Sequence, residues 1–597
     1  MHRRTKMICT IGPAVASFEK MLALIDAGMN VARLNFSHGA HADHQKSIDN
    51  LKKAREIKGL PLAIMLDTKG PEVRIGKMPE GGVELKAGQK VKLVKDGQGS
   101  EKQLPLLPAH IVDDLDVGVV VLIDDGYIAS KVVEKAADHV VIEIENDGIV
   151  SSSKGVNIPH VDLSLPSLTE QDIADITFGA DNGIDLIAAS FVRTADDVLA
   201  IKSLLRNLGK SEILVIAKIE SAMGVSNFDS ILQVADGIMV ARGDLGVEVP
   251  LTTVPMLQKM MIKKCYSSAK ACITATQMLE SMIHNPRPTR AEVSDVANAI
   301  YDSTSAVMLS GETAIGKYPI ESAQMMHSIV VQAEHDFDYE SFFTHDIHHE
   351  FNDISSSVAL AAVKTSYSAD AKALFTFTSS GYTARVMSRF RPRSPIIALT
   401  SNAKTYQQLA VNWGVVPALT KESKDVKDAF VHASCFAISH NKAEYGDLVV
   451  VTAGSSFGIT GTTNTMIVRH IGDVLVRGHT GQGERIYGSI AIVLAKEEAV
   501  DTQGKIAVIT CCESSTLEKL KGVKGIVLQN SIDDDGSKRR LEQFASENKV
   551  SYITRADGAT SLLEDGQSVT LDPARGLVFK GSIPSDDEIV ARVCQRT

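Results

Sequence analysis

A lysine and two acidic residues follow apolar strands at positions where their side chains could act together. Leu214–Ala217 reads as a buried strand that continues into Lys218 and Glu220, which face the same way because side chains alternate along a strand. Gly237–Ala241 is a second apolar strand, closely followed by Asp244. If the two strands pair, their ends lie roughly 5 Å apart. The pattern predicts a divalent cation held by Glu220 and Asp244, beside an anionic substrate facing Lys218. The alternative is a salt bridge at the strand ends, which also reduces the cost of burying charge.

Polar side chains also end the second and third predicted strands. Arg33, Asn35 and Ser37 alternate with apolar residues and therefore share one face. Asp67 and Thr68 end the next strand along the chain. Oxygen ligands of these types suit a non-transition cation, so a second cation site is expected here.

Further polar residues fall at other strand ends. Arg33 and Arg74 could clamp phosphate, because guanidinium groups bind its oxygens in pairs. Thr274 and Thr276 share a face of the seventh predicted strand, and Glu312 closes the eighth. Each has a simpler alternative, such as a surface Arg or a hydrogen-bonded core Thr. Core packing, however, does not require polar groups at most strand ends.

These residues need a scaffold whose strands end at one face. Eight short apolar runs, mostly followed by amphipathic helix, fit an α/β fold of the (β/α)8 TIM barrel type, whose catalytic residues lie at the strand C-terminal ends. We predict this catalytic barrel over residues 1–70 and 156–340. The predicted strands are Lys6–Ile11, Val31–Ser37, Leu62–Thr68, Ile184–Phe191, Ile213–Glu220, Gly237–Asp244, Cys272–Gln277 and Ala306–Glu312.

Residues 71–155 interrupt the barrel after its third strand. Short alternating runs such as Val83–Leu85, Lys90–Leu93 and Val140–Glu145, separated by Gly-rich turns, predict a small inserted β-barrel domain. The insertion leaves from the face where barrel enzymes keep their active sites. We therefore expect a hinged cap over the site.

Two α/β regions follow the barrel. Residues 341–473 alternate helices and strands, for example helix Ile354–Ser368 and strand Ala373–Phe377, which predicts a separate doubly wound domain. Residues 474–597 are predicted to form an extra C-terminal domain, with Gly478–Gly483 as a loop.

One loop of the first of these regions lies between a strand and a helix. Its hydroxyl and backbone N–H groups, at a helix N-terminus, are suited to binding phosphate. The alternative is a plain helix cap. The candidate residues are Thr378, Ser379, Ser380, Gly381 and Thr383.

Composition excludes several classes of function. A chain of 597 residues is too long for one core, and 44% hydrophobic with 23% charged residues is ordinary for a globular protein. The net charge of −11 argues against nucleic acid or an anionic membrane as partner. No apolar run approaches the roughly 18 residues of a membrane span, the N-terminus does not read as a signal peptide, and the seven cysteines match no zinc pattern. We expect a cytoplasmic protein.

Long segments of the chain closely resemble the pyruvate kinase family. They run in the family's order from about Thr5 to Gly472, and the insertion lies where the family has one. Motifs of this length in one order are specific. The matching segments are Cys9–Pro13, Arg33–His38, Asp67–Arg74, Lys154–Asn157, Lys218–Glu220, Ala241–Gly246, Ala275–Glu280 and Met308–Thr313.

The resemblance implies phosphoryl transfer from phosphoenolpyruvate to ADP in glycolysis, giving pyruvate and ATP, with Mg²⁺ (or Mn²⁺) and K⁺ as cofactors. Glu220 and Asp244 look like the Mg²⁺ ligands, and the backbone of Gly243 and Asp244 would receive the substrate carboxylate. Glu72 is similar to the residue found in potassium-dependent members. The residues that resemble the potassium site are Asn35, Ser37, Asp67 and Thr68.

The resemblance also suggests which residues face the substrates. Arg33 and Lys218 would hold the transferred phosphoryl group, and Thr276 resembles the residue associated with protonating the enolate through water. The residues expected at the nucleotide are Asn35, His38, Arg74 and Lys154.

Beyond the active site, the loop Thr378–Thr383 resembles the sugar-phosphate effector site of regulated members. We therefore expect activation by a phosphorylated sugar or AMP, and the resemblance suggests a homotetramer. Residues 474–597 are similar to the swivelling phosphohistidine domain of phosphoenolpyruvate-using enzymes, but they lack its Thr-Ser/Cys-His segment, and His479 lies outside such a motif. A structural or regulatory role is expected, and not a phosphorelay.

The chain departs from the family at two places, Asp302–Ser305 in place of a glycine-containing segment and Ala271 in place of a common proline. Neither touches a proposed ligand. Two other functions are open at this stage. A metal-dependent lyase of the same barrel type would not explain the insertion or Asp67–Arg74. An inactive regulatory relative that only binds sugar phosphates would not explain the joint presence of Lys218, Glu220, Asp244, Asn35 and Thr276.

Overall fold

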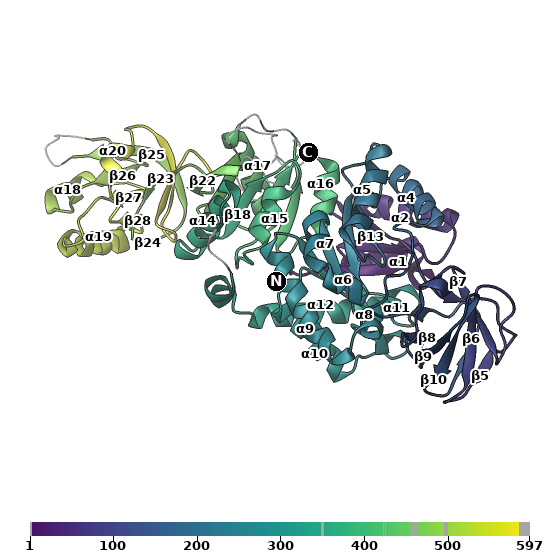
Figure 1. Cartoon of the computed structure of the whole chain (residues 1–597). Coiled ribbons are helices and arrows are strands. Elements are labelled where there is room, and N and C mark those ends of the chain that lie inside the picture. Colours follow the sequence, from purple (N-terminus) through teal and green to yellow (C-terminus); the bar gives the residue numbers. More distant parts are fainter. Residues whose placement is uncertain are drawn as a thin grey trace. The chain divides into compact units, whose positions relative to one another are not determined.

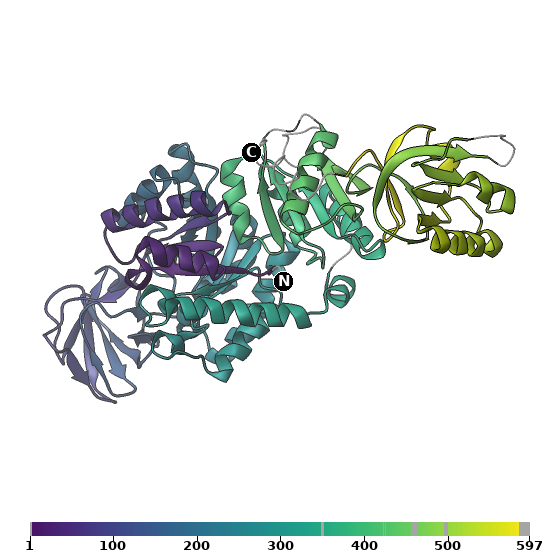
Figure 2. The ribbon, with the colours of Figure 1, turned by 180° about the vertical axis from the view of Figure 1, so that it is seen from behind.

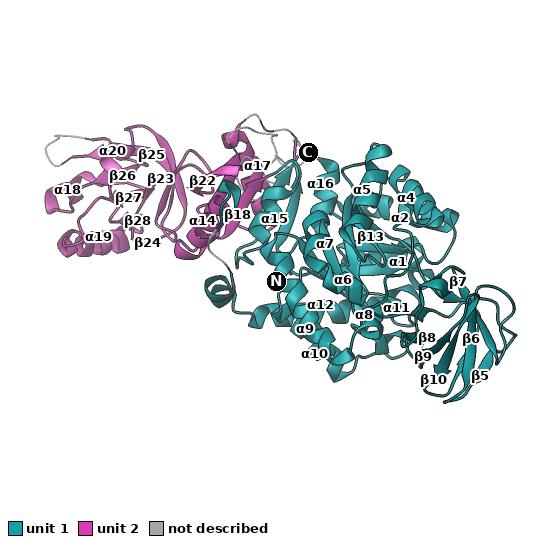
Figure 3. Ribbon diagram, in the orientation of Figure 1, with its two compact units in different colours: residues 1–356, 378–419 teal, residues 357–377, 420–597 magenta. Residues whose placement is uncertain are grey.

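The computed structural model describes residues 3–347, 351–421, 423, 425–454, 463–494 and 500–583. The remaining residues of the predicted ranges 1–70, 341–473 and 474–597 lie outside the described residues. The chain divides into two compact units, Met1–Ser356 with Thr378–Leu419 and Ser357–Phe377 with Thr420–Thr597 (Figure 3). Because this division does not follow the predicted domain boundaries, each unit is described by itself, and the boundaries stay predictions.

Eight parallel strands of the first unit close into a barrel (Figures 1 and 2). The strands are β1 Lys6–Ile11, β2 Val31–Asn35, β3 Ala63–Asp67, β13 Leu186–Ala189, β14 Leu214–Ile219, β15 Gly237–Ala241, β16 Ala271–Ala275 and β17 Ala306–Leu309. Around the barrel they follow the order β1-β17-β16-β15-β14-β13-β3-β2. The predicted barrel and its eight strands are confirmed.

Several strands end before the predicted residue because the chain turns there. The strand predicted to end at Asp244 ends at Ala241, and helix α8, Arg242–Glu248, begins directly after it. The strand predicted to end at Gln277 ends at Ala275. These turns give the polar residues orientations that a continued strand would not give them.

Apolar side chains fill the barrel, as expected for strands that are buried on both faces. Met65 of β3 and Met239 of β15 are fully buried in one cluster. Ala410 and Val411 of the 3-10 helix η5, Leu409–Val411, belong to the same cluster. The barrel interior is therefore a packed core and not a channel.

Helices alternate with the strands along the chain and surround the barrel (Figures 1 and 2). Some have strong start signals, such as the capping box of Thr169 and Asp172. The main helices are α1 Phe18–Asp26, α2 His41–Lys58, α4 Glu170–Asp181, α5 Ala195–Asn207, α6 Ala222–Ser226, α7 Phe228–Val234, α9 Val254–Ser267, α10 Arg290–Tyr301, α11 Gly311–Ala314 and α12 Pro319–Asp336.

The insertion after β3 forms a seven-stranded sheet with its own apolar cluster. In sheet order the strands are β12 Val156–Asn157, β8 Val120–Ile123, β9 Ile128–Lys135, β10 His139–Ile144, β6 Lys90–Val94, β7 Gln103–Leu107 and β4 Arg74–Ile75. A bridge between Arg74 and Gly155 links the two edges of the sheet. The insertion is therefore attached to the barrel through two chain segments that are bonded to each other.

Residues 378–419 of the first unit pack at the end of the barrel where the strands begin. They form α15 Tyr382–Ser388, β19 Ile396–Thr400, α16 Ala403–Gln408 and β20 Val415–Leu419, with β19 and β20 parallel. Lys404 Nζ of α16 donates to the carbonyls of Gly183 and Ile184, at 3.0 and 2.7 Å. These carbonyls lie just before β13, so α16 is anchored to a barrel strand.

The second unit contains two sheets. Strands β18 Ala373–Phe377 and β21 Leu448–Gly454 pair in parallel, and β22 Thr463–His470 pairs antiparallel with β21. The strands between Val474 and Lys580 form an eight-stranded sheet, called the terminal sheet here. In order its strands are β23 Val474–Arg477, β30 Leu577–Lys580, β29 Ser568–Asp572, β25 Ile486–Val493, β26 Ile506–Ile509, β27 Gly525–Leu528, β28 Ser551–Thr554 and β24 Thr480–Gln482.

The helices of the second unit include α14 Ile354–Ser368, most of which belongs to it, α17 Val426–Ser439 and α19 Asp535–Asn548. The prediction of a loop over Gly478–Gly483 was wrong, because β24 lies within it and pairs with β28. Gly478 and Gly481 approach neighbouring backbone closely, which the sequence pattern alone did not indicate. Within the described part of the chain, we find no helix with the length and apolar character needed to cross a membrane.

Candidate active site

Asp67 joins three strands at their carboxyl ends. Its buried carboxylate lies 2.5 Å from Arg33 Nε and 3.0 Å from Lys218 Nζ. Ser190, directly after β13, donates its hydroxyl to Asp67 at 3.1 Å. Burial alone would raise the pKa of Asp67, but the charges of Arg33 and Lys218 outweigh it and lower the pKa. Arg33 and Lys218, which were predicted to bind one phosphoryl group, therefore lie around one carboxylate.

Lys218 of β14 also pairs at 3.0 Å with Glu220, which directly follows the strand, as the period-two spacing predicted. Burial alone would lower the pKa of Lys218, but Asp67 and Glu220 raise it, so the ammonium stays charged. Burial, together with the charge of Asp244, raises the pKa of Glu220 to about 7. The backbone N–H of Phe191 donates to Glu220 at 2.6 Å.

Asp244 lies in the first turn of α8, and burial raises its pKa. The two carboxylates, Glu220 and Asp244, interact electrostatically, and such a pair is stabilised by a divalent cation. Among the residues that the structure describes, no group of three or more His, Cys, Asp and Glu side chains could hold a metal. Two carboxylates completed by substrate and water oxygens nevertheless fit Mg²⁺, which usually keeps several such ligands.

The chain turns sharply after β16. Thr276 and Gln277 have φ of +63° and +52°, a left-handed conformation that costs about 1–3 kcal/mol for a residue with a side chain. The hydroxyl of Thr276 accepts from Gly243 N–H at 2.8 Å and donates to the Ala275 carbonyl at 2.7 Å. Thr276 therefore contacts the start of α8, where the substrate carboxylate was predicted to bind.

Thr274 does not join the site, although the sequence placed it on the same face as Thr276. Its hydroxyl is fully buried and bonds to the Thr304 hydroxyl at 2.9 Å. Glu312 is also turned away, because it accepts backbone N–H groups of Leu279 and Ser310 at 3.0 and 2.7 Å. Both predictions rested on a strand continuing past the residue where it ends.

The residues predicted for potassium form two bonded groups. Asn35 Oδ1 accepts from the N–H of Ser37 at 3.1 Å, just past the end of β2. Thr68 Oγ1 accepts from Ser190 N–H at 3.0 Å, next to Asp67. The two groups are connected where Phe36 N–H donates to the Asp67 carbonyl at 3.0 Å. Their oxygens are of the type that a non-transition cation requires.

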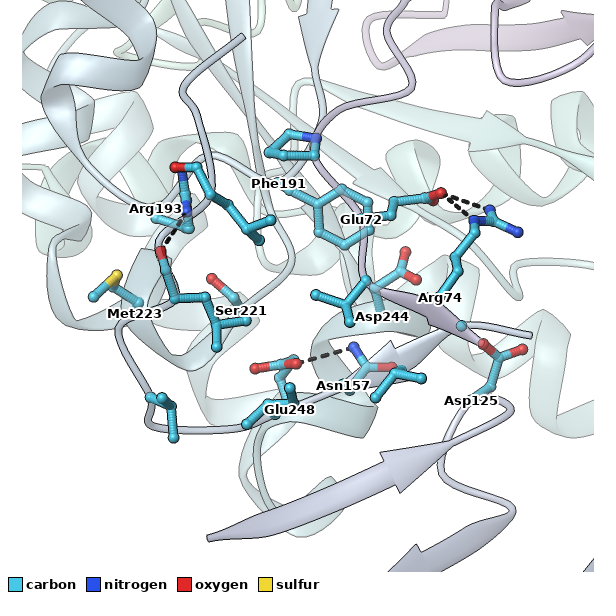
Figure 4. Close-up of a pocket in the computed structure, with 18 of the residues that line it drawn as sticks. Glu72, Arg74, Asp125, Asn157, Phe191, Arg193, Ser221, Met223, Asp244 and Glu248 are labelled. Atoms are coloured by element: carbon cyan, nitrogen blue, oxygen red, sulfur yellow. Dashed lines mark hydrogen bonds and ion pairs between the residues drawn. The ribbon is translucent and has the colours of Figure 1, made fainter. Parts of the chain in front are cut away.

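A cavity of about 370 Å³ lies between the insertion and the barrel (Figure 4). Asp244, Phe191 and Glu248 line it from the barrel, and Arg74 and Lys154 from the insertion. The other lining residues are Pro71, Glu72, Val73, Asp124, Asp125, Ser153, Gly155, Val156, Asn157, Ile158, His160, Val161, Leu163, Leu165, Arg193, Ser221 and Met223.

Each predicted nucleotide-binding cation of the cavity is paired with a carboxylate. Arg74 bonds to Glu72 at 2.6 Å (Figure 4), and Lys154 to Asp124 at 2.8 Å. Arg33, Lys218 and Thr276 are not among the described residues that line the cavity.

His38 is exposed in the loop after β2, outside the described lining of the cavity. The ring of His44 on α2 bonds to the His38 carbonyl at 2.9 Å. The structure therefore fixes the backbone of this predicted nucleotide residue but does not bring its side chain into the cavity.

Sequence reasoning missed several residues of this region. The Ser190 hydroxyl accepts a hydrogen bond from the Lys218 ammonium at 2.7 Å, and the Phe191 N–H donates one to Glu220. Both directly follow an ordinary apolar strand, and the φ of +54° at Phe191 leaves no mark in the sequence. Asn157 and Glu248 bond at 2.9 Å and tie the insertion to α8 (Figure 4). The position of Asn157 in the segment Lys154–Asn157 could have indicated it.

The predicted effector loop lies in the first unit, before α15. The Ser379 carbonyl accepts from Thr405 Oγ1 at 2.8 Å, and the Ser380 carbonyl from Arg385 Nη1 at 3.0 Å. Gly381 caps the helix with a φ of +78°. Thr378 and Thr383 flank these residues, half-buried and buried respectively.

Comparison with known proteins shows to which family the chain belongs. The barrel-domain model of pyruvate kinase matches residues 2–323, and the alpha/beta-domain model of pyruvate kinase matches residues 356–469. The chain is 42% identical to a pyruvate kinase of Geobacillus stearothermophilus, 41% to one of Sporosarcina psychrophila and 39% to one of Bacillus licheniformis. Each alignment covers 97% of this chain and 99% of the relative. With both family models matched and its charged residues gathered at the barrel mouth, the chain belongs to the pyruvate kinase family and is a phosphotransferase.

Proposed function

We propose that this pyruvate kinase transfers the phosphoryl group of phosphoenolpyruvate to ADP at the carboxyl ends of β3, β14 and β15. The observation that carries the proposal is the convergence of Lys218, Glu220 and Asp67, with Asp244 interacting electrostatically with Lys218 and Glu220. Phosphoryl transfer needs positioning and neutralisation of charge more than covalent help from the protein. Two anionic substrates repel each other, and Arg33, Lys218 and the metal ions that the carboxylates would hold counter that repulsion.

In this proposal Arg33 and Lys218 hold the transferred phosphoryl group. Both are already oriented by Asp67, so little rearrangement is needed to present them to an anion. The N–H groups of Gly243 and Asp244 receive the substrate carboxylate at the start of α8, and the Gly243 N–H is shared between that carboxylate and the Thr276 hydroxyl, to which it donates at 2.8 Å. Arg74, Lys154, Asn35 and His38 face the nucleotide, and Arg74 and Lys154 exchange their carboxylate partners for its phosphates.

The cofactors fit the same residues. Glu220 and Asp244 would hold Mg²⁺ or Mn²⁺, and Asn35, Ser37, Asp67 and Thr68 would hold K⁺. When bound, the cations supply positive charge to the transferring phosphoryl group. After transfer, the hydroxyl of Thr276 positions the water that protonates the enolate of pyruvate.

The test is a coupled assay of ATP formation from phosphoenolpyruvate and ADP, run with and without Mg²⁺ and K⁺. The expected result is activity that requires the divalent cation and rises with K⁺. Absence of ATP formation with both cations present would overturn the proposed function. Activity that is unaffected by K⁺ would remove only the potassium assignment.

We further propose that the loop from Thr378 to Thr383 binds a phosphorylated sugar or AMP that activates the enzyme. Support comes from α16, which bonds to the loop through Thr405 and to the barrel through Lys404. A ligand that orders the loop would thereby act on the segment before β13, the strand that Ser190 follows.

The effector proposal is tested with Thr383→Glu, which places a negative charge where the phosphate would bind. We expect loss of activation by sugar phosphates and AMP, while the maximal rate at saturating phosphoenolpyruvate stays unchanged. Activation that persists in this variant would contradict the proposed site.

The remaining assignments concern the whole chain. We propose that the enzyme is a cytoplasmic homotetramer and that residues 474–597 form a domain similar to the phosphoenolpyruvate-using swivelling domain. Because that region lacks the phosphohistidine segment, its role is structural or regulatory. Sedimentation analysis at several protein concentrations tests the tetramer.

A further inference from the structure

The side chain of Arg242 forms hydrogen bonds with the backbone of the turn that carries Thr276. It is the first residue of α8, and its side chain is only 11% exposed. Its Nη2 donates to the Thr276 carbonyl at 2.7 Å, and its Nε donates to the Ala275 carbonyl at 3.2 Å. The third nitrogen, Nη1, donates to Asp295 at 2.7 Å and to Gln258 at 3.4 Å. Every guanidinium nitrogen thus meets an acceptor of the protein.

The turn needs these hydrogen bonds because its backbone conformation is unfavourable. Thr276 is β-branched, and both it and Gln277 adopt positive φ. The surrounding structure must fix a backbone of this kind. Arg242 supplies two hydrogen bonds to the carbonyls on either side of the Thr276 Cα, and a planar guanidinium is suited to such a fork.

The same residue connects the turn to the substrate side of the site. Arg242 immediately precedes Gly243, whose N–H donates to the Thr276 hydroxyl at 2.8 Å. Arg242, Gly243 and Thr276 therefore form a closed set of hydrogen bonds between the ends of β15 and β16. Asp295 on α10 and Gln258 on α9 fix the outer side of this set.

We propose that Arg242, anchored by Asp295, is a positioning residue that holds the Thr276 hydroxyl where the enolate is protonated. This inference rests on the proposed role of Thr276 in pyruvate formation. Arg242 does not act on the substrate directly, because all of its guanidinium nitrogens are engaged by acceptors of the protein. It acts through the geometry of Thr276 and Gly243.

A double-mutant cycle tests whether Arg242 acts through Thr276. Arg242→Lys keeps the charge and removes the fork, and we expect kcat to fall about 10- to 100-fold, as misplacement of a reacting group does. In a Thr276→Ala background, the same change should alter kcat less than about twofold, because the group it positions is absent. Asp295→Asn should lower kcat in the same direction but less. Full additivity of the Arg242 and Thr276 effects would overturn the inference.

Arg55→Lys is the matched control. Arg55 is also 11% exposed and pairs with an aspartate, Asp185 at 3.4 Å, but it lies on α2 away from the turn. Its kcat should equal that of the wild type, and an equal loss in both variants would indicate a general structural effect.

A crystal structure of Arg242→Lys, or of Asp295→Asn if the first variant does not fold, gives a readout that is independent of activity. We expect the 276–277 turn to lose its left-handed conformation or its hydrogen bond to Gly243. An unchanged turn would refute the claim that Arg242 holds its conformation. Wild-type protein that forms no ATP would instead overturn the proposed function, so the two failures are distinguishable.

Discussion

Lys218 is the residue on which charge neutralisation depends most directly. It is buried between Asp67 and Glu220, which raise its pKa, so it acts as a fixed cation and not as a proton donor. We expect Lys218→Met to lower kcat on the order of 10²–10³-fold, with a smaller change in KM for phosphoenolpyruvate, since the cation acts where charge develops. Steady-state kinetics over a range of phosphoenolpyruvate concentrations measures both values.

The control for this substitution is Lys270→Met. Lys270 directly precedes β16, and its ammonium donates to the Gln233 carbonyl at 2.9 Å. It should leave kcat unchanged. A Lys218→Met enzyme with normal kcat and only a raised KM would contradict the proposed role of Lys218.

At this scale, alternation along strands predicted which side chains meet, but only as far as each strand extends. Lys218 lies on β14 and Glu220 directly follows the strand, and their pairing followed from period-two spacing. Thr274 and Thr276 appeared equivalent, yet the chain leaves the strand between them and only Thr276 reaches α8. Ser190 could not have been found this way, because its role depends on Asp67, which is distant in sequence.

At the scale of elements, the start of α10 is held by Glu292. This carboxylate accepts from the N–H and the hydroxyl of Ser281, at 2.7 and 2.6 Å, and from Thr289 N–H at 2.7 Å. Burial alone would raise the pKa of Glu292, but these hydrogen bonds lower it below its usual 4.5. The stability that it provides is therefore present above about pH 4.5 and is lost as the pH falls through the lowered value.

We therefore expect Glu292→Gln to lower the melting temperature at pH 7 by a few degrees, corresponding to about 1 kcal/mol for a helix cap. The difference from wild type should shrink as the pH falls below about 4.5. Thermal unfolding followed by circular dichroism at several pH values checks this, with the exposed Glu280→Gln as control. A difference that is constant with pH would contradict the assignment.

Element types were predicted more reliably than element ends. Apolar runs fixed the eight barrel strands because parallel strands buried on both faces must be apolar. The ends depended on turns such as the one at Thr276, which hydrogen bonds from distant residues maintain. The prediction of a loop over Gly478–Gly483 failed because its glycines, which permit close approach to neighbouring backbone, look like loop residues in the sequence.

At the scale of the whole molecule, the terminal sheet packs tightly against Gly446 in the second unit. A Cβ on Gly446 would lie 2.5 Å from Leu577 Cδ1, and Leu577 is 2% exposed and cannot easily move. Gly446 also has a φ of +86°. The terminal sheet, which contains Leu577, is therefore part of the packing of the unit and not a loosely attached extension of it.

Gly446→Ala should destabilise the second unit by about 1–3 kcal/mol more than Gly566→Ala. Gly566 has a similar φ of +77° but nothing within 4 Å of its added Cβ, so the comparison isolates the packing effect from the backbone effect. Urea unfolding of both variants gives the difference. The kcat of both should match the wild type, because the proposed catalytic residues lie in the first unit. Equal stability of the two variants would contradict tight packing.

The sequence predicted that the chain holds several folded regions, but the two compact units cross the predicted boundaries. Residues 378–419 group with the barrel because Lys404 and Gln408 bond to carbonyls at its base. Contacts of this kind join side chains to backbone groups far away in sequence, and no local pattern announces them.

The shared carboxylate of Asp67 limits how an inert form of this enzyme can be made. Removing it would leave the buried Arg33 without its counter-charge and Lys218 with Glu220 alone, and breaking a buried ion pair typically costs about 3–5 kcal/mol. Inactivity of such a variant would combine the loss of these ion pairs with the loss of a proposed potassium ligand. A variant intended to slow the reaction without disturbing the ion pairs is better designed at Thr276, whose hydroxyl bonds only to backbone groups of Gly243 and Ala275.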